Sequence, residues 1–425
     1  MTIPIPATHL AIALTHPGAH NPLTAIHLPT PSPSPGEALI KVTHTSASPL
    51  DLHRAAGGLG VPPPSQLQDQ QHPFILGIAV GGTVVTLGSD DAAVGSEGGE
   101  EAGKHNPPLR VGDKVIGFVQ DGDPRTASFQ EYVSVPLWRL SRVPEGMSME
   151  EAVTVPDNLA TAVNTAVTDL ELEMPWPLSG SVSEQPKVGE GEQEKESNKK
   201  LRPVLVWGAA SSVGMYLVQV LRAWGYGNVW AVASGRNHEM LKGLGARVCF
   251  DYRRKGVVEE ILRFAAADDA AVDGEEEVKK QERTGPKVPF IVDCIGSRDE
   301  TLRPISRIAE KGSRVAVMLP VINVHAAEGR TPEYEMDVGK VLPGDWAEGV
   351  ELRGVRTFHY HKNEFLRDYL QPRIIPELLR TGTVRPNKVR IVEGSTLLER
   401  VQKALDLLRD RAVSGEKLVW RVAED

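Results

Sequence analysis

Between residues 37 and 133, short apolar runs alternate with turns that are rich in glycine and proline. A hydrophobic period of two is typical of half-buried strands, and many such strands with little helix predict a barrel-like all-β region. The expected strands are residues 37–43, 74–85, 111–117 (a turn and then a strand) and 128–133. The first 36 residues are rich in proline, histidine and threonine, and they are expected to contribute a loop rather than a core element.

From about residue 150 the hydrophobic period becomes helical, beginning with a helix that opens at Pro156. From Val204 onward, buried-strand patterns alternate with helical ones, which predicts an α/β fold with a doubly wound parallel sheet. The expected strands are residues 204–207, 229–233, 247–250, 290–293 and 314–318. Helical stretches at residues 363–380 and 396–409 follow, and a last strand is expected at residues 417–421.

The stretch after the strand at residues 204–207 is built almost entirely from small residues. A strand, a tight small-residue turn and a helix start offer backbone N–H groups and the positive end of a helix dipole to a dinucleotide's pyrophosphate. The residues of this turn are Gly208, Ala209, Ala210, Ser211, Ser212, Val213 and Gly214. A strict G-x-G-x-x-G pattern is absent, so the turn alone also fits an ordinary strand-to-helix joint.

The next strand ends in Ser234, Gly235, Arg236 and Asn237. Folds specific for NAD usually carry an acidic residue there, which bonds the ribose 2′-hydroxyl and would repel a 2′-phosphate. Here a hydroxyl and a guanidinium replace the acid, and Arg236 can bind a phosphate through two nitrogens. The sequence therefore favours NADPH over NADH, with an ordinary surface charge as the alternative interpretation of Arg236.

Length and composition limit the class of protein. The 425 residues are long enough for two domains, and the net charge of −9 argues against a general nucleic-acid-binding surface. Three segments rich in small and charged residues, at 89–108, 179–200 and 268–287, are expected to be surface insertions. The N-terminus has no signal-peptide pattern and no apolar run approaches eighteen residues, so a cytoplasmic protein without a membrane span is expected.

The two cysteines, Cys249 and Cys294, both lie in apolar, strand-like contexts. They are expected to be buried free thiols in a reducing compartment rather than a disulfide. Two cysteines also exclude a four-cysteine zinc site.

The order of these parts resembles the medium-chain dehydrogenase/reductase superfamily. The motifs that carry the likeness are G-D-K-V at residues 112–115, F-Q-E-Y-V at 129–133 and G-A-A-S-S-V-G at 208–214. Residues 156–162, 169–177, 293–297 and 415–418 look most like the zinc-independent, NADPH-dependent enoyl reductases of fungal secondary-metabolite pathways. The resemblance implies a GroES-like β-barrel domain over residues 1–155, a Rossmann domain over 156–330 and a C-terminal segment, 331–425, that returns to the barrel.

Zinc-dependent members of this superfamily place cysteine after an early barrel strand and a His-Glu pair after a Leu-Gly. The matching positions here look like Ser48, Ile78 and Ala79. These side chains cannot hold Zn²⁺, which needs thiolate, imidazole or carboxylate ligands. The resemblance therefore implies chemistry without a metal.

The resemblance implies transfer of a hydride from NADPH to an activated C=C bond in a cleft between the two domains. The relatives place a P-x-D-x-basic segment in that cleft, which here is a loop reading Pro49-Leu50-Asp51-Leu52-His53. His53 is a candidate proton donor near neutral pH, with a structural loop histidine as the alternative. Asp51 is expected to orient the loop or the cofactor, and Thr161 or Asn158 to offer a hydrogen bond to the substrate.

The same resemblance implies the remaining site residues. Those expected at the cofactor are Pro49, Leu50, Asp51, Leu52, Gly208, Ala210, Ser211, Ser212, Val213, Gly214, Ser234, Gly235, Arg236, Asn237, Tyr252, Ile295, Gly296, Lys417 and Leu418. Those expected at the substrate are Pro156, Asn158, Thr161, Met318, Leu319, Pro320 and Val321. Ordinary packing is the alternative for the last four, and a strand-end aromatic is the alternative for Tyr252.

Three functions stay open at this point. The first is an enoyl reductase for a small or carrier-bound substrate, working in trans with a polyketide synthase. The second is a reductase of quinones or other α,β-unsaturated carbonyls, because the same hydride geometry serves both. The third is an NADPH-binding partner protein without turnover. A monomer or a homodimer fits each of them.

Overall fold

In a computed structural model of the chain, the described residues are 4–18, 22–67, 73–88, 108–120, 122–177, 200–272, 285–327 and 330–423. They form two compact units. The first contains Met1–Ala160, Val324–Glu333 and Phe358–Asp425, and the second contains Thr161–Asn323 and Tyr334–Thr357. The first two expected insertions lie almost entirely outside the described residues.

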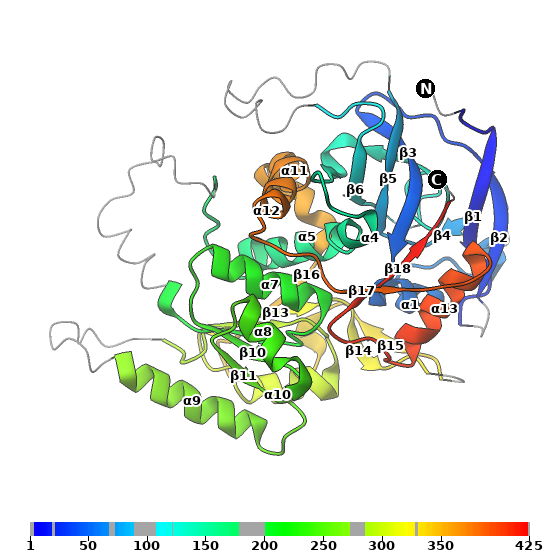
Figure 1. The fold of residues 1–425 in the computed structure, drawn as a ribbon. Coiled ribbons are helices and arrows are strands. Elements are labelled where there is room, and N and C mark those ends of the chain that lie inside the picture. The colour runs from blue at the N-terminus through cyan, green and yellow to red at the C-terminus, as the bar shows by residue number, and fades with distance from the viewer. Residues whose placement is uncertain are drawn as a thin grey trace. The chain divides into compact units, whose positions relative to one another are not determined.

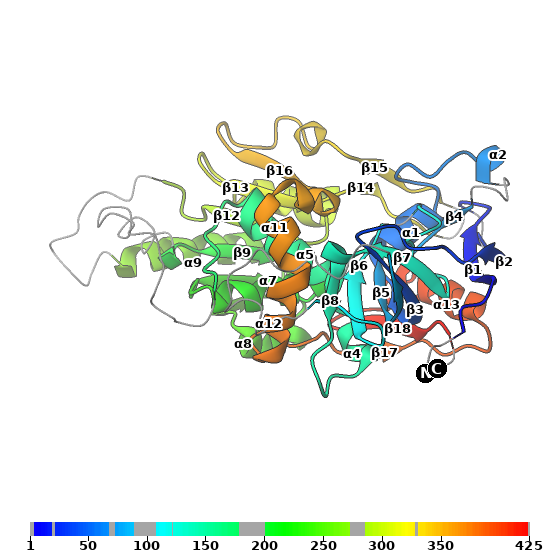
Figure 2. The ribbon, with the colours of Figure 1, turned by 90° about the horizontal axis from the view of Figure 1, so that it is seen from above.

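The first unit is built on a seven-stranded sheet in which β17, β18, β3, β5, β6 and β8 follow one another and β7 pairs with β3 (Figures 1 and 2). Its strands are β3 (Glu37–Ser46), β5 (Ala79–Leu87), β6 (Lys114–Phe118), β7 (Tyr132–Pro136), β8 (Leu140–Arg142), β17 (Val389–Ile391) and β18 (Lys417–Arg421). Apolar side chains on these strands, such as Ile40, Val80 and Trp420, are fully buried. The predicted β region and the predicted terminal strand are confirmed.

A second sheet of this unit was not predicted. Strand β1 (Thr8–Leu14) lies between β2 (Leu23–Pro29) and β4 (Phe74–Ile75), in the order β2-β1-β4. The prolines around these strands led to the wrong expectation of a loop. The apolar residues of β1, among them Ile12 and Leu14, are nevertheless fully buried, and their burial stabilises the hairpin.

Two other strand predictions in this unit were displaced. The apolar run 74–85 is broken into β4 and β5 at Gly77, whose φ of +103° only glycine adopts readily. The strand expected at residues 128–133 is instead β7, four residues later. The backbone N–H groups of Ser128 and Phe129 donate to the carbonyls of Gly77 and Leu76, outside the main sheet.

Short helices complete the first unit. They are α1 (Pro49–Ala55), α2 (Pro64–Leu67), η1 (Leu137–Arg139), α4 (Met149–Ala152), η6 (Thr357–Lys362), α11 (Glu364–Tyr369), η7 (Leu370–Ile374), α12 (Ile375–Arg380) and α13 (Leu397–Arg409). Helix α13 packs against α1 and β2 (Figure 2). This helix confirms the helical stretch predicted at residues 396–409. Thr396 caps it, because its side chain accepts a hydrogen bond from the Glu399 N–H. Helix α5 (Pro156–Asn164) begins in this unit.

The second unit is organised around a six-stranded, fully parallel sheet in the order β11-β10-β9-β12-β13-β16. Its strands are β9 (Val204–Trp207), β10 (Val229–Val232), β11 (Val248–Phe250), β12 (Phe290–Asp293), β13 (Arg314–Met318) and β16 (Glu351–Val355). The doubly wound parallel sheet is confirmed. Only β16, an edge strand with alternating exposed and half-buried positions, was not predicted.

Helices lie against this sheet, with α7 (Ser212–Ala223) and α8 (His238–Leu244) near β9, β10 and β11 (Figure 1). The others are η2 (Thr165–Asp169), η3 (Gly235–Asn237), α9 (Val257–Val272), η4 (Arg298–Leu302), α10 (Arg303–Ser306) and η5 (Val338–Lys340). Helix α9 extends into the third expected insertion, because its alanine-rich end has high helix propensity. Short strands β14 (Val321–Val324) and β15 (Glu333–Glu335) lie where the chain passes between the units.

The strand order reverses direction between β9 and β12, where the chain has crossed to the other side of the first strand. Open parallel sheets bind ligands at the carboxyl ends of the strands on either side of such a switch point. The residues that follow Trp207 and Asp293 are therefore where a ligand is expected to bind. Among the described helices, none is long and apolar enough to cross a membrane.

Candidate functional site

The small-residue turn after β9 requires both of its glycines. Gly208 has a φ of +75°, and a Cβ there would lie 2.6 Å from the Ile295 side chain. A Cβ on Gly214 would lie 2.7 Å from the Cα of Ala209. The first glycine therefore permits the turn, and the second lets α7 approach the turn closely.

The turn leads directly into the N-terminus of α7. Ser211 caps the helix, because its Oγ accepts a hydrogen bond from the Gly214 N–H at 3.1 Å. The N–H groups of Ser212 and Val213 belong to the first helical turn and so have no acceptor within the helix. Residues 210–213 are half exposed, so this end of the helix is accessible to an anion.

The loop after β12 adjoins this turn. The Cys294 N–H donates to the Trp207 carbonyl at 2.9 Å, and Ile295, 38% exposed, covers Gly208. Cys294 is a buried free thiol, as predicted, and burial raises its pKa far above the usual range. Cys249 is also a free thiol but only half buried, contrary to the expectation of a buried one.

Asp293 holds the loop in shape, a role that the sequence analysis did not assign. Its Oδ1 accepts hydrogen bonds from the N–H groups of Ile295 at 2.9 Å and Gly296 at 3.1 Å, and its Oδ2 lies 2.5 Å from the Thr301 hydroxyl. Burial raises the pKa of Asp293 to about 6, although these hydrogen bonds oppose the rise. The segment 293–297 therefore contains, in Asp293, the side chain that fixes its own loop.

Gly296 connects this loop to the segment after β13. Its φ is +72°, a Cβ there would lie 2.4 Å from the Met318 carbonyl oxygen, and its own carbonyl accepts from the Ile322 N–H. Met318 and Leu319 are half exposed, whereas Pro320 is buried and Val321 is 0% exposed within the core. For Val321 the structure thus shows the packing that the sequence analysis held as the alternative to substrate contact.

At the end of β10 the four predicted residues divide into two buried and two exposed ones. Gly235 and Arg236 are exposed, whereas Ser234 and Asn237 are buried, with the Asn237 amide donating to the Ser234 Oγ at 3.2 Å. Arg236 forms no ion pair with any residue in the described ranges. Tyr252, 50% exposed, follows β11. An exposed guanidinium and an exposed phenol are therefore present on this side of the sheet.

In the first unit, the segment from Pro49 to His53 is helical, so the expectation of a loop was wrong. Ser48 caps α1 and accepts from the Leu50 N–H at 3.1 Å, while the Asp51 carboxylate accepts from the Ser48 N–H at 2.7 Å. A serine followed three residues later by an acid, with proline at the first helical position, is a helix-start signal that the sequence already contained. Leu50 is half exposed and Leu52 is buried.

Asp51 is completely buried and bonds the protein itself. Besides Ser48, its carboxylate accepts from the Gly77 N–H at 3.2 Å, which links α1 to the turn between β4 and β5. This geometry orients the segment that carries His53, in line with one of the two roles expected of Asp51. The other expected role, a contact with the cofactor, stays a prediction.

His53 is 9% exposed on α1. Burial, and to a smaller extent the neighbouring His325, lowers the pKa of its imidazole to about 4. The ring is therefore neutral at pH 7. It retains an N–H that can donate a hydrogen bond, but it carries no extra proton near neutral pH in this state.

Asn158 and Lys417, expected at the substrate and the cofactor, both contact Asp157. The Lys417 Nζ lies 3.2 Å from the Asp157 Oδ2, and the Asn158 Nδ2 donates to the Asp157 Oδ1 at 2.7 Å. Asp157 and Lys417 are each less than 5% exposed, and Leu418 is 1% exposed. Pro156 is buried at the start of α5, and Thr161 on the same helix is half exposed. The sequence analysis assigned no role to Asp157, although this residue holds both Asn158 and Lys417.

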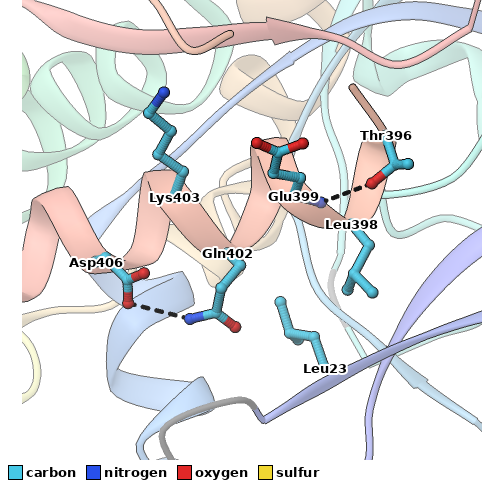
Figure 3. Close-up of a pocket in the computed structure, with 7 residues that line it drawn as sticks. All are labelled: Leu23, Thr396, Leu398, Glu399, Gln402, Lys403 and Asp406. Carbon is cyan, nitrogen blue, oxygen red and sulfur yellow. Dashed lines mark hydrogen bonds between the residues drawn. The ribbon is translucent and has the colours of Figure 1, made fainter. Parts of the chain in front are cut away.

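A separate pocket lies along α13 and does not include any of the predicted site residues (Figure 3). Its lining residues are Leu23, Thr396, Leu398, Glu399, Gln402, Lys403 and Asp406. Polar groups on this face bond one another, as the Gln402 amide does to Asp406 at 3.0 Å. The pocket therefore adds no chemistry to the predicted site.

The predicted residues thus fall into two groups that are each described within one unit. The second unit brings together the turn after β9, the end of β10, Tyr252 and the loop after β12, all at the carboxyl edge of its sheet. Positively charged and N–H groups are accessible there, and glycines leave room for close approach. This edge fits a nicotinamide dinucleotide, with the pyrophosphate at the start of α7.

Residues 34–145 match the family model of the alcohol dehydrogenase GroES-like domain. The chain is 32% identical over 262 residues to trans-enoyl reductase tazE of Aspergillus terreus, covering 62% of this chain and 74% of that protein. It is 30% identical over 260 residues to trans-enoyl reductase tndF of Aspergillus flavipes, covering 61% of this chain and 64% of tndF, just under two thirds.

A longer match joins the chain to the lovastatin nonaketide synthase enoyl reductase component lovC of Aspergillus terreus. It is 25% identical over 350 residues and covers 82% of this chain and 81% of that protein. Among solved structures, the fold is similar to a quinone oxidoreductase from Coxiella burnetii (TM-score 0.63, 21% identity, 98% and 100% of the two chains) and to CurK enoyl reductase (TM-score 0.62, 16% identity, 98% and 99%).

Proposed function

Because the chain belongs to the enoyl reductase-like branch of the medium-chain dehydrogenase/reductase superfamily, whose members are oxidoreductases, we propose that it is an NADPH-dependent, zinc-free enoyl reductase. When bound, NADPH supplies a hydride to the β-carbon of an α,β-unsaturated thioester. The observation that carries the proposal is the strand-turn-helix at the β9/β12 switch point. There, accessible N–H groups meet two glycines that tolerate no Cβ.

The preference for NADPH is supported by the end of β10. Arg236 is exposed and without an ion pair among the described residues, which leaves its guanidinium available for a 2′-phosphate. Ser234, in the position where NAD-specific folds carry an acid, has no charge to repel that phosphate.

The absence of a zinc mechanism is supported by the chemistry of three side chains. Ser48 caps α1, and Ile78 and Ala79 are buried hydrocarbon side chains at 5% and 0% exposure. None of them is a thiolate, an imidazole or a carboxylate, so the positions used for zinc elsewhere in the superfamily have no suitable ligand.

The chain's own residues then have three tasks. Asp51 fixes α1 and with it His53, whose neutral imidazole offers an N–H to the oxygen on which charge develops. Asn158, held by Asp157, and Thr161 offer further donors on α5. Because His53 carries one ring proton only, we assign the proton for the α-carbon to water.

The substrate class rests on the relatives. The trans-enoyl reductases and the synthase component lovC support a carrier-bound enoyl chain and a polyketide synthase that acts together with this protein. The likeness to a quinone oxidoreductase is one of fold alone, so quinone reduction is an outcome of the test rather than a second proposal.

The test is oxidation of NADPH by the purified chain, in the presence of a chelator, with a short enoyl thioester or a small quinone. We expect turnover of the thioester. Gly214→Ala should weaken NADPH binding about tenfold or more by pushing α7 away from the turn, whereas Gly227→Ala, where a Cβ meets nothing within 4 Å, should not. Turnover of quinone alone would assign the rival function, and NADPH binding with neither substrate consumed would leave only a binding role.

A further inference from the structure

The acid that the sequence lacks at the end of β10 is supplied by the next strand. Asp251 follows β11, and its Oδ2 accepts a hydrogen bond from the Gly235 N–H at 3.0 Å. A Cβ on Gly235 would lie 2.9 Å from the same oxygen, so the carboxylate is in contact with the turn. A negative charge therefore lies beside the residues that are proposed to receive a 2′-phosphate.

This carboxylate is covered by Arg253. The Arg253 backbone N–H and Nε donate to the Asp251 Oδ1 at 3.0 and 3.2 Å, and its Nη2 donates to Oδ2 at 3.3 Å. The Asp251 side chain is 16% exposed and that of Arg253 is 55% exposed. The guanidinium is thus the accessible part of the pair.

The charges of the pair decide which cofactor it favours. A bare carboxylate next to Gly235 would bond a ribose 2′-hydroxyl and repel a phosphate dianion. With Arg253 bound to it, the pair is neutral and presents guanidinium N–H groups outward. The hydrogen bonds from Arg253 and Gly235 lower the pKa of Asp251 to about 2, so Asp251 stays charged and the masking depends on Arg253.

We propose that Arg253 determines cofactor selectivity, because it masks Asp251 and offers its guanidinium to a 2′-phosphate next to the β10 turn that carries Arg236. The inference rests on the proposed function to the extent that the chain must bind a nicotinamide dinucleotide. In this arrangement Asp251 is a positioning residue, since it holds the Gly235 N–H and the guanidinium in place. Arg253 then distinguishes NADPH from NADH together with Arg236.

The experiment measures the Kd of the full chain for NADPH and for NADH separately, by cofactor fluorescence. Arg253→Ala exposes Asp251 and should weaken NADPH about tenfold or more, while NADH is unchanged or tighter. Adding Asp251→Asn to that variant should recover part of the NADPH affinity, because the repelling charge is gone. The matched control is Arg254→Ala, an exposed neighbouring arginine, which should leave the ratio of the two Kd values unchanged.

If Arg253→Ala changes the ratio of the two Kd values by less than twofold from wild type, this inference is overturned, but the proposed function is not. If Arg253→Lys keeps most of the NADPH affinity that Arg253→Ala loses, the inference is supported, since lysine retains the positive charge without the two-pronged geometry. A wild-type chain that binds neither dinucleotide would overturn the proposed function and this inference with it. The two failures are therefore distinguishable by the wild-type measurement.

Discussion

At the carboxyl edge of the second unit's sheet, the groups placed to meet a ligand are accessible: Gly235 and Arg236 are exposed, and the first turn of α7 is half exposed. In the first unit, Asp51, His53 and Lys417 are 0%, 9% and 3% exposed. The edge of the second unit's sheet presents backbone N–H groups and surface charges. The predicted site residues of the first unit are instead buried polar groups that bond neighbouring parts of the protein. Substitutions in the second unit's edge should therefore change ligand binding first, and those in the first unit should change stability first.

The largest expected effect breaks the buried pair in the first unit. Lys417→Ala removes the cation that pairs with the Asp157 carboxylate, whose side chain is 4% exposed, and this should lower the free energy of unfolding by about 3–5 kcal/mol. Urea denaturation measures this, with the surface variant Lys403→Ala as the control. A loss below about 1 kcal/mol would show that water reaches the pair and would remove the contrast with the second unit.

The next effect is a pH dependence that has opposite signs in the two units. His53 has a folded pKa of about 4 against an ordinary value of 6.5, so the unfolded chain binds its proton first as pH falls. Its contribution to stability is complete above pH 6.5 and is lost progressively as the pH falls to 4, by up to about 3 kcal/mol. Asp293 has a folded pKa of about 6 against 3.8, so its contribution is complete below pH 3.8 and is lost as pH rises through 6.

The contributions of His53 and Asp293 are separated by comparing the free energy of unfolding of each single variant with that of wild type at every pH. Relative to wild type, His53→Gln should gain stability as the pH falls from 6.5 to 4, and Asp293→Asn should gain stability as it rises from 3.8 to 6. Urea denaturation at several pH values follows both. Parallel stability curves for a variant and wild type over its window would contradict the burial assigned to that side chain.

The smallest expected effect concerns Arg236. Arg236→Ala should weaken NADPH about tenfold, the value of one charge-assisted interaction at an exposed site, and should leave NADH binding and the unfolding midpoint unchanged. Titration with each cofactor measures it. Equal loss for both dinucleotides would remove Arg236 from the 2′-phosphate contact while leaving the turn after β9 in its role.

Much of the second unit could be predicted because its signals are local. Strands β9, β12 and β13 have the predicted bounds, since short apolar runs flanked by glycine or polar residues specify a buried strand without reference to the rest of the chain. The turn at Gly208 and the cap at Thr396 are likewise encoded within a few residues. The helix start at Ser48 was equally local, and it was missed because a family motif was interpreted as a loop.

The remaining properties depend on neighbours that are distant in the sequence. The sequence by itself determined a β region, a doubly wound parallel sheet, a small-residue turn between β9 and α7 and an arginine after β10. Only the tertiary structure decided that Asp251 lies against Gly235, that Lys417 pairs with Asp157 across 260 residues, and that His53 is buried and neutral. Element type follows from local backbone sterics and hydrophobic period, whereas charge pairing and pKa follow from burial, which exists only once the chain has folded.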